Sequence, residues 1–136
     1  MEPEIIYLIA CDNVATDPLN LHRINLHGLM ARLWSTSVPP FPVLRPEFCV
    51  FAMFTGGQGA IDIAIRVVND LSGQTVYRTG AHRIRFAGQR DDVTGATFRI
   101  RGCKFPAAGL YWIECLAARS VIGRQRLWVL PRRNMP

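Results

Sequence analysis

Four arginines form the pattern in this sequence that is best suited to chemistry. They stand in two i, i+2 pairs: Arg83 with Arg85, and Arg99 with Arg101. Residues two apart on a β-strand point to the same face, so each pair presents two guanidinium groups together. Like charges opposite each other destabilise a sheet, so four arginines on neighbouring strands would need an anion. A phosphate backbone or an acidic protein surface would supply that anion.

Two other arrangements would leave these arginines without an anion-binding role. The two strands could belong to different sheets, or nearby carboxylates could neutralise the guanidinium groups. The acidic residues available for this are Asp62, Asp91, Asp92 and Glu114. The sequence alone leaves both alternatives open.

The charge balance points to an anionic partner without identifying it. The net charge is +6 and the pI about 9.8, which favours nucleic acid, anionic lipid or an acidic protein. Only Lys104 among the 16 basic residues is a lysine, a bias that a GC-rich genome also produces. No basic run is dense enough for a polybasic arm, since the tail 131–136 holds two arginines.

Cysteine and histidine do not form a recognisable site. The closest two of the four cysteines are Cys103 and Cys115, which is too far apart for a zinc pair, so we expect buried free thiols at Cys11, Cys49, Cys103 and Cys115. His22, His27 and His82 lack acidic neighbours at ligand spacing and are expected to be polar surface or capping residues.

We predict no metal site and no cofactor. No nucleophile motif is present, so we expect a protein that is not an enzyme.

The tryptophans of the last two apolar segments could stack on nucleic-acid bases if they were exposed. Trp112 and Trp128 both alternate with apolar neighbours. That pattern favours packing in the core, which makes binding of single strands or of carbohydrate a minor alternative.

The elements that must position these residues are strands. Alternating or continuous apolar residues predict nine of them, at 4–11, 22–34, 47–55, 60–69, 75–78, 82–87, 96–101, 110–118 and 122–130. Segment 22–34 could also begin a helix, but we favour one strand bent at Gly28. Four prolines make 35–46 an extended connector, and the glycines in 56–59 predict a hairpin turn. The expected fold is an all-β sandwich of eight or nine strands.

The length of 136 residues and the 49% of hydrophobic residues fit one domain. We assign residues 1–131 to this sandwich domain and 132–136 to a short basic tail. No apolar run reaches the roughly 18–20 residues of a membrane span, and the first residues are acidic. A cytoplasmic protein without a membrane partner is therefore expected.

One corner of the chain carries a resemblance. The run from Ala108 through Gly109 and Tyr111 to Ile113 resembles the start of the penultimate strand in immunoglobulin-like sandwiches. The tyrosine hydroxyl there bonds back to the preceding loop, which gives Gly109 and Tyr111 a structural role. Ile113 stands where antibody domains have a cysteine, so a reduced, immunoglobulin-like sandwich is implied.

The whole chain also resembles an uncharacterised family of small bacterial cytoplasmic β-sandwich proteins. The shared segments are Cys11–Asp12, Arg23–Gly28, Phe54–Gly57, Arg66–Asp70 and Phe105–Tyr111. This resemblance implies a fold and gives no catalytic residues. We therefore expect a protein–protein interaction or assembly subunit, with self-association. The alternative is a nucleic-acid-associated accessory protein that binds phosphates through the four arginines.

Overall fold

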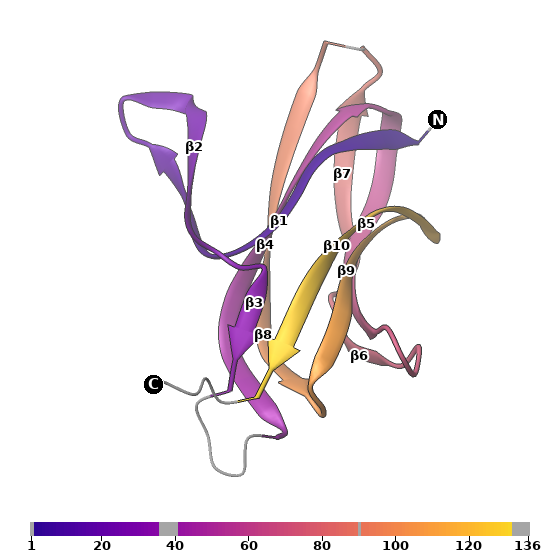
Figure 1. Cartoon of the computed structure of the whole chain (residues 1–136). Helices are drawn as coiled ribbons and strands as arrows, with labels where there is room; N and C mark the ends of the chain where they lie inside the picture. Colours follow the sequence, from indigo (N-terminus) through magenta and orange to yellow (C-terminus); the bar gives the residue numbers. More distant parts are fainter. Residues whose placement is uncertain (1, 36–40, 90, 132–136) are drawn as a thin grey trace.

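The computed structural model describes residues 2–35, 41–89 and 91–131 (Figure 1). Within these ranges the secondary structure consists of strands, and no helix is present that could cross a membrane. Ten strands are described: β1 (Pro3–Asp17), β2 (Asn20–Leu29), β3 (Arg32–Trp34), β4 (Val43–Gly56), β5 (Gln58–Asn69), β6 (Thr75–Arg78), β7 (His82–Ala87), β8 (Val93–Phe105), β9 (Gly109–Ala117) and β10 (Ser120–Leu130).

The strands form two sheets that pack against each other, so the all-β prediction is confirmed. The first, which we call sheet A, has the order β2-β1-β4-β8. The second, sheet B, has the order β3-β10-β9-β5-β6, and β7 also pairs with β5. The tail 132–136 and residues 36–40 of the predicted connector lie outside the described residues.

The strand predicted at 22–34 is divided in two, which raises the number of strands above the eight or nine expected. Gly28 has a φ of +68° and β2 ends at Leu29. The Met30 N–H then donates to Ala10 O in sheet A, whereas Ala31 O accepts from Trp128 N–H in sheet B. The chain therefore changes sheets at this point, and its two halves cannot form one strand.

The core lies between the sheets and follows the alternation of the sequence. Phe48 and Phe54 from β4 and Phe98 from β8 meet Ile65 and Ile113 from sheet B, and all five side chains are buried. Burial of such side chains stabilises the fold by about 1.5–3 kcal/mol each. β4 lies between β1 and β8 and is apolar on both faces, as predicted for a central strand.

The glycines at 56–59 do not make the predicted hairpin turn. In sheet A, β4 is already paired with β1 on one side and with β8 on the other. The next strand must therefore start in the other sheet. Gly56 and Gly57 carry the chain across with φ angles of +68° and +77°. A Cβ on Gly57 would lie 3.0 Å from Cβ of Pro3, so this crossing requires glycine for space as well as for conformation.

The corner before β9 has the hydrogen bond that the resemblance implies. The Tyr111 hydroxyl donates to Ala107 O at 2.8 Å and accepts from Ala107 N–H at 3.3 Å. Its buried ring packs edge to face on Phe105, with the centroids 5.0 Å apart. Gly109 has a φ of +138°, which ordinary residues avoid.

β1 is long enough to serve two purposes. From Pro3 to Cys11 it pairs with β4, and from Cys11 onward it pairs with β2. We call residues 12–29 the arm, because this hairpin projects from sheet A (Figure 1). At its tip the Leu19 N–H donates to Oδ1 of Asp17 at 2.8 Å, which is the turn chemistry expected of aspartate.

Candidate functional site

The structure places the four predicted arginines in different sheets. Arg83 and Arg85 lie on β7 in sheet B, whereas Arg99 and Arg101 lie on β8 in sheet A. The reason is pairing: β7 is hydrogen-bonded to β5 and β8 to β4. The four guanidinium groups therefore do not share one sheet face.

Carboxylates also partly neutralise these arginines. Arg83 Nε lies 3.2 Å from Oδ1 of Asp62, its cross-strand partner. Glu47 lies between the other pair, 3.0 Å from Arg99 and 4.0 Å from Arg101. Arg85 forms no ion pair with any described residue.

The tryptophans, by contrast, gather on the outer face of sheet B. Trp34 is on β3, Trp112 on β9 and Trp128 on β10. Trp34 and Trp128 are 37% and 43% exposed, and Trp112 is half-buried. The prediction that Trp112 and Trp128 pack in the core is therefore wrong.

The physical reason is the two-residue period of a strand. The apolar neighbours that favoured burial, such as Ile113 and Val129, fill the core themselves. Because successive side chains point to opposite faces, a tryptophan between two core residues must face outward. Leu33 and Trp34 in β3 follow the same rule.

The register sets the tryptophans on a diagonal. Trp112 lies opposite Arg126, Trp128 lies opposite Leu110 and Arg32, and Trp34 lies opposite Leu130. From Trp112 on β9 to Trp128 on β10, and from Trp128 to Trp34 on β3, the position therefore shifts by one strand and by two residues along the strand. With strands about 4.8 Å apart and about 3.3 Å per residue, successive tryptophans are about 8 Å apart.

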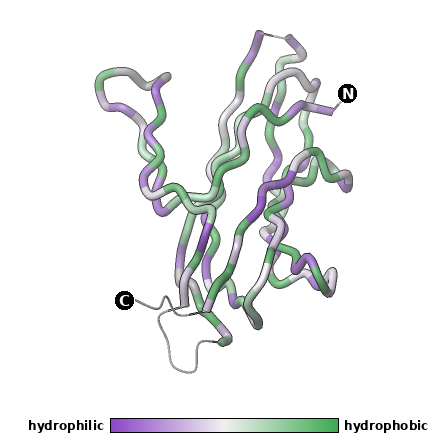
Figure 2. The backbone as a smooth tube through the Cα atoms, viewed as in Figure 1, coloured by the Kyte–Doolittle hydropathy of each residue, from purple (hydrophilic) through white to green (hydrophobic). Residues whose placement is uncertain are grey.

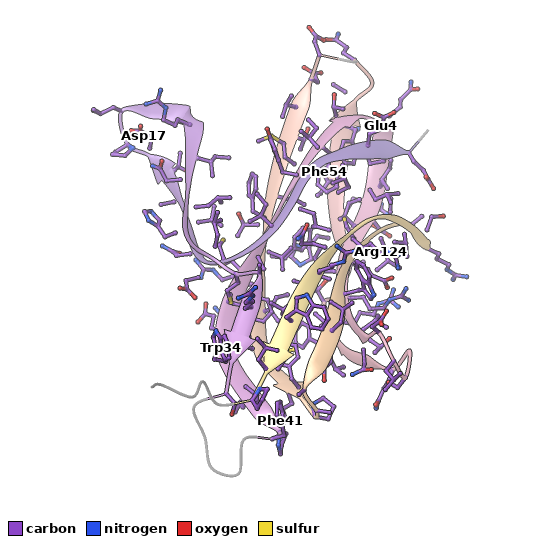
Figure 3. All side chains as sticks on the ribbon, in the orientation of Figure 1. Glu4, Asp17, Trp34, Phe41, Phe54 and Arg124 are labelled. Atoms are coloured by element: carbon purple, nitrogen blue, oxygen red, sulfur yellow. The ribbon has the colours of Figure 1, made fainter. Side chains whose placement is uncertain are left out.

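Arginines fill the positions between these rings. Arg126 and Arg32 form a second diagonal beside the first, and Arg124 and Arg66 continue the basic surface across β10 and β5. Figure 3 labels Trp34 and Arg124 toward opposite ends of this stretch of sheet, and Figure 2 shows the corresponding part of β10 as hydrophilic. We call this surface the Arg–Trp face; it consists of Trp34, Trp112, Trp128, Arg32, Arg66, Arg78, Arg124 and Arg126.

Trp112 fixes two of these guanidinium groups. Its indole Nε1–H donates to Oδ1 of Asp70 at 2.7 Å, which holds the ring in place. Arg124 Cζ lies 4.2 Å from the ring centroid and Arg126 Cζ lies 5.4 Å from it. Both distances fall within the range of a cation–π interaction, so the indole orders two cations on the surface.

The Arg–Trp face keeps an excess of positive charge. Nε and Nη2 of Arg66 lie 2.8 and 2.7 Å from Oε1 of Glu114, and this pair is half-buried. In the part of the chain that the structure describes, the other arginines of the face have no carboxylate partner: Arg32, Arg78, Arg124 and Arg126. The face therefore presents four unneutralised cations beside exposed aromatic rings.

The remaining candidate residues do not form a site. All four cysteines are free and buried, and burial raises the pKa of the Cys103 and Cys115 thiols to about 12. Burial, then Cys49 and Asp12, also raise the pKa of Cys11. The His82 ring rests 5.0 Å from the Phe98 ring. Among the described residues, no three potential ligands lie together as a metal site would require.

The residues of the Arg–Trp face carry the same i, i+2 spacing that singles out the four predicted arginines. Arg124, Arg126 and Trp128 follow it in one strand, and Arg32 and Trp34 follow it in another. This spacing is the signal in the sequence that could have found the Arg–Trp face.

The pairing of β3 with β10 is the part of the Arg–Trp face that no local spacing indicates. In this parallel ladder Val129 lies opposite Leu33, and Leu130 lies opposite Trp34. Segments this far apart in the chain become neighbours only through the fold. Spacing within one strand therefore could not place Trp34 beside Trp128.

These features describe an all-β protein of two packed sheets, with arginine and tryptophan side chains on one outer face. The chain belongs to a family of unknown function (DUF6941), whose family model matches residues 6–129. This agrees with the expected resemblance to an uncharacterised family, and the match includes every tryptophan of the Arg–Trp face. No curated protein matches the chain.

Proposed function

We propose that this protein is a non-enzymatic binding module of the bacterial cytoplasm that binds single-stranded nucleic acid through the Arg–Trp face. We further propose that its sandwich is immunoglobulin-like, which the Tyr111 corner supports. The observation that carries the functional proposal is the diagonal of three tryptophans interleaved with arginines on an exposed sheet face.

The two residue types match the two parts of a nucleic-acid strand. Exposed rings such as those of Trp34 and Trp128 offer surfaces on which bases stack, and this stacking is worth about 1–3 kcal/mol per base. Guanidinium groups held on Trp112 can contact phosphates or stack on bases themselves. A sheet face is also too broad to enter a duplex groove, which favours single strands.

A protein partner is the second candidate. Exposed apolar side chains on and beside the arm favour it, namely Tyr7 at 54%, Leu29 at 67% and Leu19 at 96% exposure. Such residues suit an interaction or assembly subunit, including one that associates with itself. Light scattering over a range of concentrations tests the self-association, and a monomer at every concentration would count against it.

The nucleic-acid proposal is tested by fluorescence anisotropy with a labelled oligouridylate and a labelled oligothymidylate. The double variant Trp34→Ala/Trp128→Ala should weaken binding by about 30-fold or more, because it removes two stacking surfaces. Tyr7→Ala is the matched control, since Tyr7 is an exposed aromatic residue on sheet A. An equal loss with Tyr7→Ala, or no binding of either oligonucleotide at low salt, would contradict the proposal.

A further inference from the structure

The arm and the outer face of sheet A enclose an apolar hollow of about 300 Å³. Ile24 and Leu26 of β2 line it from the arm. The sheet supplies the other lining residues, which are Tyr7, Ile9, Phe51 and Met53. A Cβ built on Gly95 would lie 3.6 Å from Cδ1 of Ile24, so the arm reaches across the sheet as far as β8.

This hollow adjoins a second one that is cationic. On the arm, Val14 lies directly opposite Leu26, and on the sheet, Thr97 lies directly opposite Phe51. Val14 and Thr97 line the second hollow together with Thr16, His82, Arg99 and Arg101. Since the arm and the outer face of sheet A border both hollows, we treat them as one cleft with an apolar half and a cationic half. His82 of β7 also lines the cationic half, from the edge of sheet B.

Arg99, Arg101 and Glu47 together carry one positive charge in the cationic half. Arg99 and Arg101 share the carboxylate of Glu47, at 3.0 and 4.0 Å. Their side chains are 51% and 71% exposed, so both remain accessible to a ligand. An occupant that complements this cleft has an apolar body and a single anionic group.

We propose that the cleft binds a small amphipathic anion of the linear aliphatic carboxylate class. The aliphatic chain lies between Leu26 and Phe51, where each buried methylene favours binding. The carboxylate lies at Arg99 and Arg101, where charge-assisted hydrogen bonds hold it. The volume fits the lower end of the range of about 300–1,000 Å³ found for small-molecule sites. This site does not depend on the Arg–Trp face, which is on the other sheet.

Isothermal titration calorimetry with dodecanoate, below its micellar concentration, tests the proposal. One molecule should bind per chain. Dodecyltrimethylammonium, which has the same chain and the opposite charge, should bind at least about tenfold more weakly because the arginines repel it. Equal binding of the two amphiphiles, or no binding of dodecanoate, would overturn the proposal.

Variants locate the bound anion. Ile24→Ser should weaken dodecanoate binding on the order of tenfold, and Arg101→Gln by about three- to tenfold. Arg83→Gln is the matched control on sheet B and should change nothing. Ile24 is 36% exposed, so the serine variant should fold, and circular dichroism verifies this. Unchanged affinity in the folded Ile24→Ser variant would overturn the site. A dimer that Ile24→Ser dissociates, without dodecanoate binding, would show that a second copy occupies the cleft instead.

Discussion

The outer faces of the two sheets differ although both are built from alternating strands. On sheet A the outward Phe51 is 4% exposed and Cys49 is fully buried, because other parts of the protein cover them. On sheet B the outward Trp128 is 43% exposed and lies beside arginines. Alternation in the sequence therefore shows which side chains point away from the core, but not whether another element covers them.

The outer face of sheet A is covered because β1 is long. Its 15 residues exceed what pairing with β4 uses, and the surplus becomes half of the arm. The sequence beneath the arm is accordingly apolar, as at Ile9 and Met53. Sheet B has no comparable extension among the described residues, and its outward Trp34 and Trp128 stay exposed beside arginines.

At neutral pH, the strongest contrast in stability is expected between one aromatic residue from each face. Phe51→Ala should lower the free energy of unfolding by about 3 kcal/mol, since it empties a buried site. Trp128→Ala should lower it by less than about 1 kcal/mol, because the ring is exposed. Urea unfolding measures both. Equal losses of unfolding free energy in the two variants would show that the two outer faces do not differ in burial.

The next effect separates two ion pairs of sheet B. Glu114→Gln should cost about 2 kcal/mol, because it leaves the half-buried Arg66 guanidinium without its carboxylate. Asp62→Asn breaks the more exposed pair with Arg83 and should cost less than about 0.5 kcal/mol. Chemical unfolding at low and high salt distinguishes them, and a larger loss at Asp62 would be inconsistent with the deeper burial of the Arg66 pair.

The tyrosine corner gives a smaller effect. Tyr111→Phe should lower the free energy of unfolding by about 1–1.5 kcal/mol, because a buried hydroxyl loses its bond to Ala107. Tyr77→Phe removes only a 3.4 Å contact with Arg101 N–H and should cost less than about 0.5 kcal/mol. Thermal and urea unfolding of the two variants test this order.

The last effect arises only at alkaline pH and is a pH dependence of stability. The pKa of Cys103 and of Cys115 is raised by burial from 9.0 to about 12, so the folded state holds these protons more tightly than the unfolded state. Stability from this source is present below pH 9 and is lost as the pH rises toward 12. Cys103→Ala/Cys115→Ala should flatten the decline between about pH 9 and 11, as measured by urea unfolding. An unchanged slope would show that other groups cause it.

Much of the fold can be predicted from the sequence, because local alternation identifies strands. It predicts strands around Phe48, Ile65 and Ile113, and each of these strands supplies the core. Sheet membership cannot be predicted in this way. It depends on pairing between distant segments, which places Arg83 and Arg99 in different sheets.

The candidate site is predictable only in its chemistry. Arginines spaced for one strand face are the correct signal, but burial of Trp128 is the wrong expectation, because its neighbours Leu127 and Val129 fill the core. The division of segment 22–34 is also beyond sequence reasoning, since a change of sheet after Gly28 leaves no mark in hydrophobic alternation.

The salt dependence of oligouridylate binding is the most direct test of nucleic-acid binding by the Arg–Trp face. The logarithm of the binding constant should fall with the logarithm of the salt concentration, with a slope of about −0.7 per contacted phosphate. Arg32→Gln/Arg124→Gln/Arg126→Gln should make that slope shallower by about 2, because three phosphate contacts are lost. Arg83→Gln/Arg99→Gln/Arg101→Gln removes the same charge elsewhere and should leave the slope unchanged. Equal slopes in the two triple variants would show that binding depends on net charge and not on the Arg–Trp face.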